Sequence, residues 1–255
     1  MPPAAKAIGR QKLPGQSTRD KILDAAEMMF SMHGYEACSL RMISEAYDIN
    51  LGLIPYYFGG KEGLFSAVFL RRSETLVSGR RALLSDARKR FGNGPIPVVE
   101  IARCFVAPSV DMMKAGEGPR AYIHLQGLLR SDPSDFSRKL RGEAFNATNK
   151  KFIRELQRSC PHLTRASVVW RFSAMVGAFY SLISRSARVD ELSGGLCDSN
   201  DIDAALSEAI PFIAGGFDAS SPAESAPPRP SPPSPRSPKF VSRAGKRPTR
   251  VAATR

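Results

Sequence analysis

The chain has 255 residues, of which 42% are hydrophobic and 24% are charged, and its formal net charge is +13 at neutral pH. This apolar share is enough to build a buried core, which excludes a wholly disordered protein, and the positive charge makes polyanions the first partners to consider. The four cysteines lie far apart and form no Cys-x-x-Cys pair, which argues against a zinc site or a disulfide framework and predicts four reduced thiols.

The two ends of the chain differ in composition from the rest. Residues 1–16 are rich in Pro, Ala and Lys and predict a flexible basic arm that lacks the apolar stretch of a secretory signal. Residues 218–255 hold eight cations against two acids, so nearly half of the excess positive charge lies there. This Pro/Ser/Arg-rich segment buries too little apolar surface to offset the entropy of ordering its backbone, and we expect a disordered basic tail.

Between these ends, apolar residues recur at helical spacing, and no run alternates apolar and polar residues as a strand would. The sequence therefore predicts an all-α protein. The first helix begins at Ser17 and ends at Gly34, two short helices follow Ser39 and Asn50, and a long helix begins at Lys61 and continues to residue 90. Four or five more helices are expected over 97–115, 118–130, 135–159, 164–187 and 200–215.

The most apolar helical stretch, residues 172–183, is shorter than the roughly 20 residues that span a bilayer. We therefore expect no membrane association and a cytoplasmic location.

Residues 39–61 have the features of a helix-turn-helix unit. Ser39 and Asn50 are placed to cap two short helices, and Asp48 with Ile49 makes the tight turn between them. Such a unit lays its second helix in the major groove of DNA. The residues expected on the inner faces are Leu40, Ile43 and Ala46 on the first helix, and Leu53 or Ile54 with Phe58 on the second.

The stretch from Thr18 to Phe65 carries a more specific signal. It contains Thr18-Arg19, Ile22-Leu23, Ala25-Ala26, Phe30, Gly34-Tyr35, Ser39-Leu40, Ile43-Ser44, Ile49-Asn50, Gly52, Ile54, Tyr56-Tyr57-Phe58, Lys61-Glu62 and Leu64-Phe65 in one register. This stretch resembles the N-terminal domain of the tetracycline-repressor (TetR) family of transcriptional regulators. Residues 39–43, 49–51, 57–61 and 170–178 resemble its PsrA-like subgroup. The resemblance implies a DNA-binding domain over 17–63 and a helical ligand-binding and dimerisation domain over 64–217.

The resemblance also implies roles for individual residues. Arg41 would donate to a base edge, Leu51, Gly52 and Leu53 would face the groove, and Tyr56, Tyr57 and Lys61 would contact phosphates. The helix ends capped by Ser39 and Asn50 would favour phosphate as well. Leu51 and Pro55 depart from the family pattern, and neither side chain donates a hydrogen bond. Direct readout would then depend on Arg41, on contact with thymine methyl groups and on DNA shape.

The predicted DNA-binding domain is itself slightly acidic. Residues 17–63 hold four cations and seven acids, so affinity for phosphate must come from a few placed groups, from helix ends, and from the arm and tail. The long helix that follows is rich in cations, which we expect to form a solvated face. These cations are Arg71, Arg72, Arg80, Arg81, Arg88, Lys89 and Arg90.

The resemblance implies a ligand cavity in the larger domain, and we expect its occupant to be a small apolar effector such as a fatty acid or acyl compound. Most apolar residues there belong to the core, and a fraction would line the cavity, where His124, Arg130 and Arg171 are candidate anchors for a carboxylate. The candidate effector-binding residues are Met113, Tyr122, His124, Phe145, Phe152, Arg171, Met175 and Phe179.

A homodimer is expected, because one recognition helix reads only one half-site of a palindromic operator in double-stranded DNA. The helices at 164–187 and 200–215 would form its interface, with Met175, Gly177 and Ala178 allowing close approach.

The main hypothesis is thus a ligand-responsive, sequence-specific regulator, most simply a repressor. The alternative is a non-specific or architectural DNA-binding protein driven by the basic arm and tail. An enzyme ranks last, because the sequence shows no paired carboxylates, catalytic triad or phosphate-binding glycine loop, and no cofactor or metal is expected.

Overall fold

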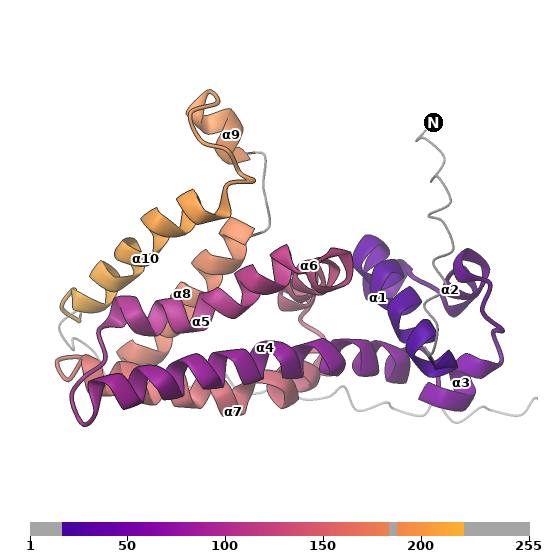
Figure 1. The fold of residues 1–255 in the computed structure, drawn as a ribbon, viewed down its shortest axis with the longest axis horizontal. Helices are drawn as coiled ribbons and strands as arrows, with labels where there is room; N and C mark the ends of the chain where they lie inside the picture. Colours follow the sequence, from indigo (N-terminus) through magenta and orange to yellow (C-terminus); the bar gives the residue numbers. More distant parts are fainter. Residues whose placement is uncertain (1–16, 184–187, 222–255) are drawn as a thin grey trace, which may run out of the picture. The chain divides into compact units, whose positions relative to one another are not determined.

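The computed structural model describes residues 17–183 and 188–221, and every regular element in these two ranges is a helix. The predicted all-α fold is confirmed. The predicted arm lies outside the described residues, as does the predicted tail beyond residue 221. The helices, drawn in Figure 1, are α1 (Thr18–Ala37), α2 (Leu40–Tyr47), α3 (Leu53–Phe58), α4 (Lys61–Phe91), α5 (Val98–Lys114), α6 (Glu117–Ser131), α7 (Asp135–Ser159), α8 (Arg165–Ile183), α9 (Arg188–Ser193) and α10 (Ile202–Asp218).

The first helix begins and ends where its sequence predicts. Ser17 caps α1, since its Oγ accepts a hydrogen bond from the Asp20 amide at 3.1 Å. Gly34 takes a left-handed backbone conformation (φ 73°), which interrupts the helix and leaves one further turn before Cys38. A residue without a Cβ adopts this conformation at no steric cost.

The helix boundaries follow the predicted ones closely, with differences near the C-terminal end. The helix expected over 164–187 is α8, which is described as far as Ile183. A short helix that the sequence did not predict, α9, comes next, and α10 extends to Asp218, one residue into the predicted tail.

The apolar helix α8 is longer than the stretch 172–183 considered from the sequence. Within the described ranges it is the one helix that is long and apolar enough to cross a membrane by length and composition. It also packs against α7 and α10, and Phe172 and Phe179 on its inner face are buried. Such contacts are typical of a core helix.

The long helix α4 organises the packing. α5 and α7 lie along it, while α1 and α3 pack near its N-terminal end (Figure 1). Buried apolar side chains form one continuous core from Ile22 in α1 to Phe217 in α10. The described residues therefore form a single compact unit, which contains both the predicted DNA-binding region and the predicted effector region.

A buried charge cluster links α1 to α4. Glu27 of α1 is only 1% exposed. Its Oε1 accepts from Arg72 Nε at 2.8 Å, and its Oε2 accepts from Arg72 Nη2 at 2.9 Å and from Arg71 Nη2 at 3.1 Å. Arg71 also donates to Asp24 Oδ1 at 2.8 Å. These charge-assisted hydrogen bonds compensate the hydration that Glu27 loses on burial, and they fix α1 on α4.

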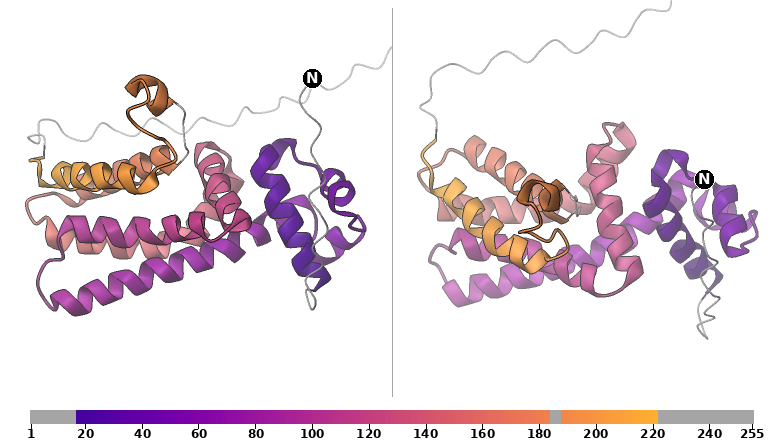
Figure 2. Two further views of the ribbon diagram at one scale, coloured as in Figure 1. Left: turned by 45° about the horizontal axis from the view of Figure 1, so that its top comes forward. Right: turned by 90° about the horizontal axis from the view of Figure 1, so that it is seen from above.

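The helix α6 completes this junction from the other side. Figures 1 and 2 show α6 beside α1, and the two helices are in contact. Gly118 of α6 lies directly over the charge cluster, because a Cβ there would be 2.9 Å from Arg72 Nη2 and 3.1 Å from Glu27 Oε2. One turn and a half further on, His124 Nδ1 lies 3.0 Å from the Ser31 carbonyl of α1. A shift of α6 would therefore disturb its contacts with α1 directly.

We predicted that seven cations of α4 form a solvated face, and this prediction is wrong for four of them. Arg71 and Arg72 bind the acids of α1, and Arg88 pairs with Glu155 of α7. Arg80 is 2% exposed and lies against α5. The partners come from other helices, so helical spacing within α4 gave no sign of them. The cations that do remain largely exposed are Arg81, Lys89 and Arg90.

All four cysteines are free thiols, as predicted. Cys38, Cys104 and Cys160 are buried, and burial raises the pKa of the Cys104 thiol to about 11. Cys197 is exposed.

Replacing Glu27 by Gln should lower the free energy of unfolding by about 2 to 3 kcal/mol, because the partly buried guanidinium of Arg72 would lose its carboxylate partner and Arg71 would keep only Asp24. The matched control is Glu74→Gln, which removes the carboxylate of the solvent-exposed Glu74–Arg81 pair and should cost less than about 1 kcal/mol. Urea unfolding followed by circular dichroism measures both values. Equal costs for the two substitutions would contradict a special role for the cluster.

Candidate nucleic-acid interface

The turn between α2 and α3 is set by side-chain hydrogen bonds, as the sequence predicts. Ser39 Oγ accepts from the Met42 amide at 3.1 Å and so caps α2. Asp48 ends α2 in a left-handed conformation (φ 53°), and Ser44 Oγ donates to the Ile49 carbonyl at 2.6 Å across the turn. The two short helices are therefore held at a fixed angle.

Asn50 stabilises the turn that precedes α3. Its Oδ1 accepts from the Gly52 amide at 2.9 Å, and its carbonyl accepts from the Leu53 amide at 3.0 Å. The helix itself begins at Leu53, three residues after the predicted cap. Asn50 thus satisfies a backbone donor in the turn that leads into α3.

One side of α3 is anchored in the core. Ile54 is fully buried, and Phe58 is half-buried beside it, as predicted. Leu53, which the resemblance placed toward the groove, is half-buried and packs against the same core. On α2, Ala46 was expected on the inner face but is exposed, and Met42 packs against the core. The inner face of α2 is thus formed by Leu40, Met42 and Ile43.

The step from α3 to α4 depends on a glycine. A Cβ at Gly63 would lie 1.8 Å from the Phe58 carbonyl oxygen, far inside van der Waals contact. Only glycine allows the end of α3 to approach the first turn of α4 so closely. The orientation of α3 is therefore fixed by backbone contact with α4 as well as by Ile54.

The opposite side of α3 carries most of the predicted DNA-contacting residues. Leu51, Gly52 and Pro55 are exposed, and Tyr56 and Tyr57 are 79% and 40% exposed. The two tyrosine rings meet edge to face with their centres 5.0 Å apart. This row of apolar and phenolic side chains faces solvent on a helix held rigidly from behind. Ser39 and Asn50 are exposed as well.

Arg41 lies on the exposed side of α2, where its side chain is 80% exposed. Its Nε donates to Glu45 Oε1 at 2.6 Å, one turn along the helix, and this hydrogen bond with the charge of Glu45 raises the pKa of Arg41. Exposed pairs of this kind contribute little stability, so a phosphate or a guanine edge can displace Glu45.

Lys61 has a structural role that the sequence did not predict. Its Nζ donates to the Glu36 carbonyl at 3.0 Å and lies 4.6 Å from the centre of the Tyr35 ring. The ammonium thereby closes the C-terminal end of α1 while two of its three donors stay available for another acceptor.

Arg19, which the predicted site does not include, lies beside α3. Its guanidinium carbon is 5.3 Å from the centre of the Phe58 ring. The Thr18-Arg19 pair belongs to the stretch on which the family resemblance was based, but no local spacing connects α1 with α3. Only the fold shows that this cation belongs to the same surface.

The charge balance of residues 17–63 overstates the acidity of the unit. Asp24 and Glu27 are bound by Arg71 and Arg72, which lie outside that range. Asp20 accepts from the Ser17 hydroxyl at 2.6 Å in the cap of α1. These three carboxylates therefore already have hydrogen-bond partners within the fold.

A cavity of about 310 Å³ lies in the helical body behind this unit, with walls from α4, α5, α6, α7 and α8. Its lining is rich in arginine and amide side chains and includes four arginines but no carboxylate. The lining residues are Phe69, Arg80, Phe105, Gln126, Arg130, Arg138, Arg141, Gly142, Phe145, Asn146, Asn149, Val176 and Tyr180.

Of the eight predicted effector-binding residues, Phe145 lines this cavity. Arg171 instead caps α10, because its Nη1 donates to the carbonyls of Gly216 at 2.7 Å and Ala219 at 2.6 Å. His124 lies at the contact with α1 described above. The other five belong to the buried core, namely Met113, Tyr122, Phe152, Met175 and Phe179.

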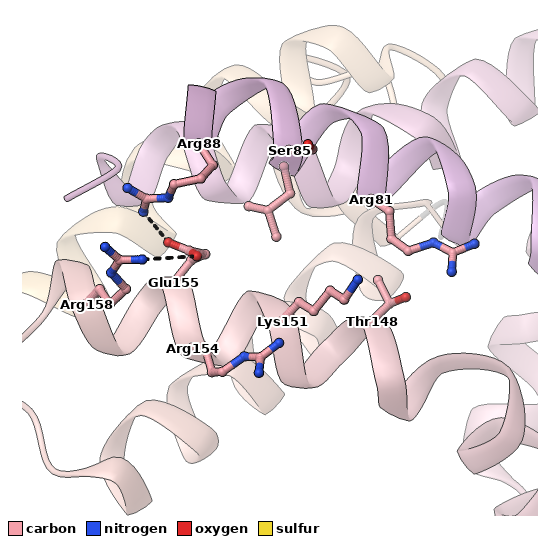
Figure 3. A pocket seen from close by; sticks show the side chains of 9 residues that line it. Arg81, Ser85, Arg88, Thr148, Lys151, Arg154, Glu155 and Arg158 are labelled. Carbon is pink, nitrogen blue, oxygen red and sulfur yellow. Dashed lines mark hydrogen bonds and ion pairs between the residues drawn. The ribbon is translucent and has the colours of Figure 1, made fainter. Parts of the chain in front are cut away.

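A second, more open depression of about 370 Å³ lies between α4 and α7 (Figure 3). Arg81, Lys151 and Arg154 project along it, and Glu155 pairs with Arg88 and, at 3.9 Å, with Arg158. The acid in the middle of the row neutralises its neighbours, and the remaining cations are solvated. We assign no site to this groove.

Large apolar side chains are exposed on α8 and α10. Trp170 is 78% exposed and Phe212 is 77% exposed, and Val169 is 43% exposed. The two helices pack against each other, so these residues lie on neighbouring elements. Met175, which was expected at the same surface, is 2% exposed and belongs to the core.

Two family models match the chain, one from α1 into the first turns of α4 and the other from α5 to α10. Residues 22–68 match the model described as "Bacterial regulatory proteins, tetR family", and residues 103–216 match "Tetracyclin repressor-like, C-terminal domain". The chain belongs to the tetR family of bacterial regulatory proteins. The first match covers α2, α3 and their turn, so the exposed face of α3 corresponds to the helix-turn-helix of DNA-binding regulators. The PsrA-like subgroup is not confirmed by these matches and stays a prediction.

Curated relatives match mainly the N-terminal region. The probable regulator YttP of Bacillus subtilis is 46% identical over 48 residues, which are 19% of this chain and 23% of YttP. The repressor ComR of Escherichia coli is 34% identical over 103 residues, 40% of this chain and 48% of ComR. The chain thus spans less than half the length of these TetR-like relatives.

A solved structure extends the likeness to the whole fold. The fatty acid degradation regulator FadR from Bacillus halodurans is 15% identical and superposes with a TM-score of 0.55, over 81% of this chain and 98% of that one. At this identity the likeness concerns the fold alone, and it includes the helical body as well as the DNA-binding unit.

The orientation of α3 can be tested by two truncations. Ile54→Ala should lower the free energy of unfolding by about 3 kcal/mol, since it opens a cavity in the core, whereas Tyr56→Ala should change it by less than about 0.5 kcal/mol. Thermal unfolding of both variants measures the difference. A large loss for Tyr56→Ala would mean that this ring is packed and does not face DNA.

Proposed function

We propose that this chain is a sequence-specific regulator of transcription that inserts α3 into the major groove of an operator. The observation that carries the proposal is the exposure of Leu51, Pro55, Tyr56 and Tyr57 on a helix that Ile54 and Gly63 fix from behind. Exposed side chains of this kind bury little surface within the fold. Their place in a tetR-family helix-turn-helix supports a role in DNA recognition.

The proposed contacts fall into two groups, phosphate contacts that give affinity and base contacts that give sequence specificity. Tyr56, Tyr57, Lys61 and Arg19 would contact phosphates, which position the protein on the duplex. Arg41 would leave Glu45 and donate to a guanine edge, and Leu51 and Pro55 would contact thymine methyl groups. Few side chains in this set donate hydrogen bonds to bases, so sequence-dependent DNA shape supplies part of the specificity.

A second copy of the chain would cover the exposed apolar faces of α8 and α10. Trp170 and Phe212 are large, nearly fully exposed and placed on adjacent helices, and burial of such residues is worth about 1.5 to 3 kcal/mol each. Two copies would present two α3 helices to half-sites about 34 Å apart, as a palindromic operator requires.

Regulation would arise from a small molecule bound in the helical body. The cavity is lined by α4 and α6, and both helices contact α1. A ligand that favours one arrangement of these helices would change the placement of α3 and hence the affinity for DNA, most simply releasing a repressor. Such a regulator would act in the cytoplasm, where the operator lies.

Selection of bound sequences from random double-stranded DNA tests this function. We expect a palindromic consensus, for which Arg41→Ala should lower affinity by about ten- to a hundredfold and relax the preference at one position of each half-site. Arg154→Ala, in the solvated groove between α4 and α7, is the control and should leave affinity unchanged. Absence of any enriched consensus would reject the proposal, and loss of all binding on removal of residues 218–255 would favour an architectural, non-specific binder.

The proposed dimer is tested by light scattering after size-exclusion chromatography. The unmodified chain should be a dimer, and the double substitution Trp170→Glu with Phe212→Glu should make it a monomer, because the charges would be buried without partners. Leu196→Glu changes an apolar residue that is also largely exposed but lies outside α8 and α10, and it should leave the dimer intact. A monomeric unmodified chain would contradict this interface.

A further inference from the structure

A cation is buried in the middle of the helical body without a counter-charge. Arg80 of α4 is 2% exposed. Its Nε donates to the Phe105 carbonyl at 2.8 Å, its Nη2 donates to Ser109 Oγ at 3.2 Å, and its guanidinium carbon lies 3.7 Å from the centre of the Phe105 ring. All these partners are neutral, and among residues 17–183 and 188–221 no carboxylate pairs with Arg80.

An unpaired charge in the interior is costly to fold around. Desolvation lowers the pKa of Arg80, yet a guanidinium remains protonated in proteins. The fold therefore keeps a positive charge where an aliphatic residue of similar size would pack at lower cost. Such a group is expected where a ligand supplies the missing negative charge.

The cavity described above opens onto this guanidinium. Four arginines contribute to its walls, but two of them have partners already. Arg138 pairs with the Asp135 carboxylate at 2.8 Å, and Arg141, which donates to the carbonyls of Leu129 and Asp132 at the end of α6, also interacts electrostatically with the Asp132 carboxylate.

Arg130 is the other wall arginine that stands beside an aromatic ring and has no carboxylate partner. Its guanidinium carbon lies 5.7 Å from the centre of the Tyr180 ring. Arg80 and Arg130 therefore remain as the two cations of the cavity that a bound anion can neutralise.

A buried amide adds a directed donor to the same wall. Gln126 of α6 is 4% exposed, and its Oε1 accepts from the Tyr180 hydroxyl. Its Nε2 is buried and makes no hydrogen bond of normal geometry, and the Gln126 side chain lies near the Tyr122 hydroxyl, which is buried without such a bond as well. A donor left unsatisfied in the interior costs about 1 to 3 kcal/mol unless a ligand accepts from it. Gln126 and the two arginines thus offer donors to one acceptor-rich group.

The rest of the lining is apolar and limits the size of the ligand. Phe69, Phe105, Phe145 and Val176 form this part of the wall. The volume of about 310 Å³ lies at the lower end of the range for small-molecule sites. A compact ring or short chain fits such a space next to the cationic end.

We infer that the cavity binds an organic anion whose carboxylate or phosphate head accepts hydrogen bonds from Arg80, Arg130 and Gln126 and whose compact apolar part lies against the phenylalanines. This assignment rests on the proposed function only for the role of the anion as effector. It keeps the carboxylate expected from the sequence and Arg130 as one of its anchors, and it replaces the other two expected anchors, His124 and Arg171, with Arg80 and Gln126. The cations come from α4 and α6, the two helices that meet α1 at Glu27 and His124.

Calorimetric titration of the full chain tests the charge of the ligand. The probes are benzoate, phenylacetate, hexanoate and phenyl phosphate, each compared with a neutral counterpart (benzamide, phenylacetamide, hexanamide and phenol). We expect at least one anion to bind and its counterpart to bind at least tenfold more weakly. The carboxylate and phosphate probes distinguish the two head groups. If no anion binds more tightly than its neutral counterpart, the inference is overturned.

Variants locate the binding. Arg130→Gln keeps a polar side chain on an exposed position of α6 and should weaken binding of the anion about tenfold, which corresponds to the loss of one charge-assisted hydrogen bond. Arg80→Met should abolish binding if the variant folds, and circular dichroism checks folding. Arg154→Gln removes an arginine from the other basic depression and should leave binding unchanged. Equal affinity for the unmodified chain and Arg130→Gln would overturn the assignment.

Failure of this inference is distinguishable from failure of the proposed function. Sequence selection is performed without the anion, so an enriched consensus with no anion binding overturns only the cavity assignment. Anion binding without any consensus rejects the DNA-binding function and upholds the cavity. When both succeed, the anion should change operator affinity at least fivefold, and an unchanged affinity would overturn its role as effector.

Discussion

The structure depends on one buried carboxylate. Glu27 joins α1 to two successive arginines of α4, and α6 passes over the same cluster at Gly118. Other polar contacts join the same helices, namely Arg71 with Asp24, Lys61 with the Glu36 carbonyl and His124 with the Ser31 carbonyl, but they lie nearer the surface. At the buried centre of the junction, charge-assisted hydrogen bonds from three donor atoms to Glu27 fix the register of α1 on α4. The DNA-facing helix α3 rests on this frame, since Ile54 and Gly63 fix it to a core that α1 and α4 share.

The local features of the DNA-binding unit could be predicted from the sequence because their causes are local. The Ser39 cap, the Asp48 turn and the buried Ile54 each involve residues within a few positions of one another. The charge cluster could not be predicted, because Glu27 and Arg72 are 45 residues apart and helical spacing in α4 marks Arg72 only as a polar position. The position of Arg19 beside Phe58 could not be predicted for the same reason.

The effector site was predicted less well, for a different physical reason. Aromatic residues at helical spacing in a bundle mostly pack against each other, and five of the predicted eight do so. The cavity is marked instead by polar groups that should not be buried, above all Arg80 and the amide of Gln126. Sequence shows the type of such residues but not their burial, and burial is what makes an unpaired guanidinium informative. Residues of both α4 and α6 line this cavity, and both helices contact α1, so a bound ligand would affect the two helices that position α1.

The most direct test of this account is a double-mutant cycle between Glu27→Gln and Arg72→Gln, measured by urea unfolding. If the cluster fixes α1 on α4, the double variant should be less destabilised than the sum of the two single variants by at least about 1 kcal/mol, because both substitutions disrupt the hydrogen bonds between Glu27 and Arg72. Unfolding in one transition is expected for the unmodified chain. Strict additivity of the two losses in unfolding free energy would show that these side chains do not hold the helices together, which would contradict the central role of Glu27.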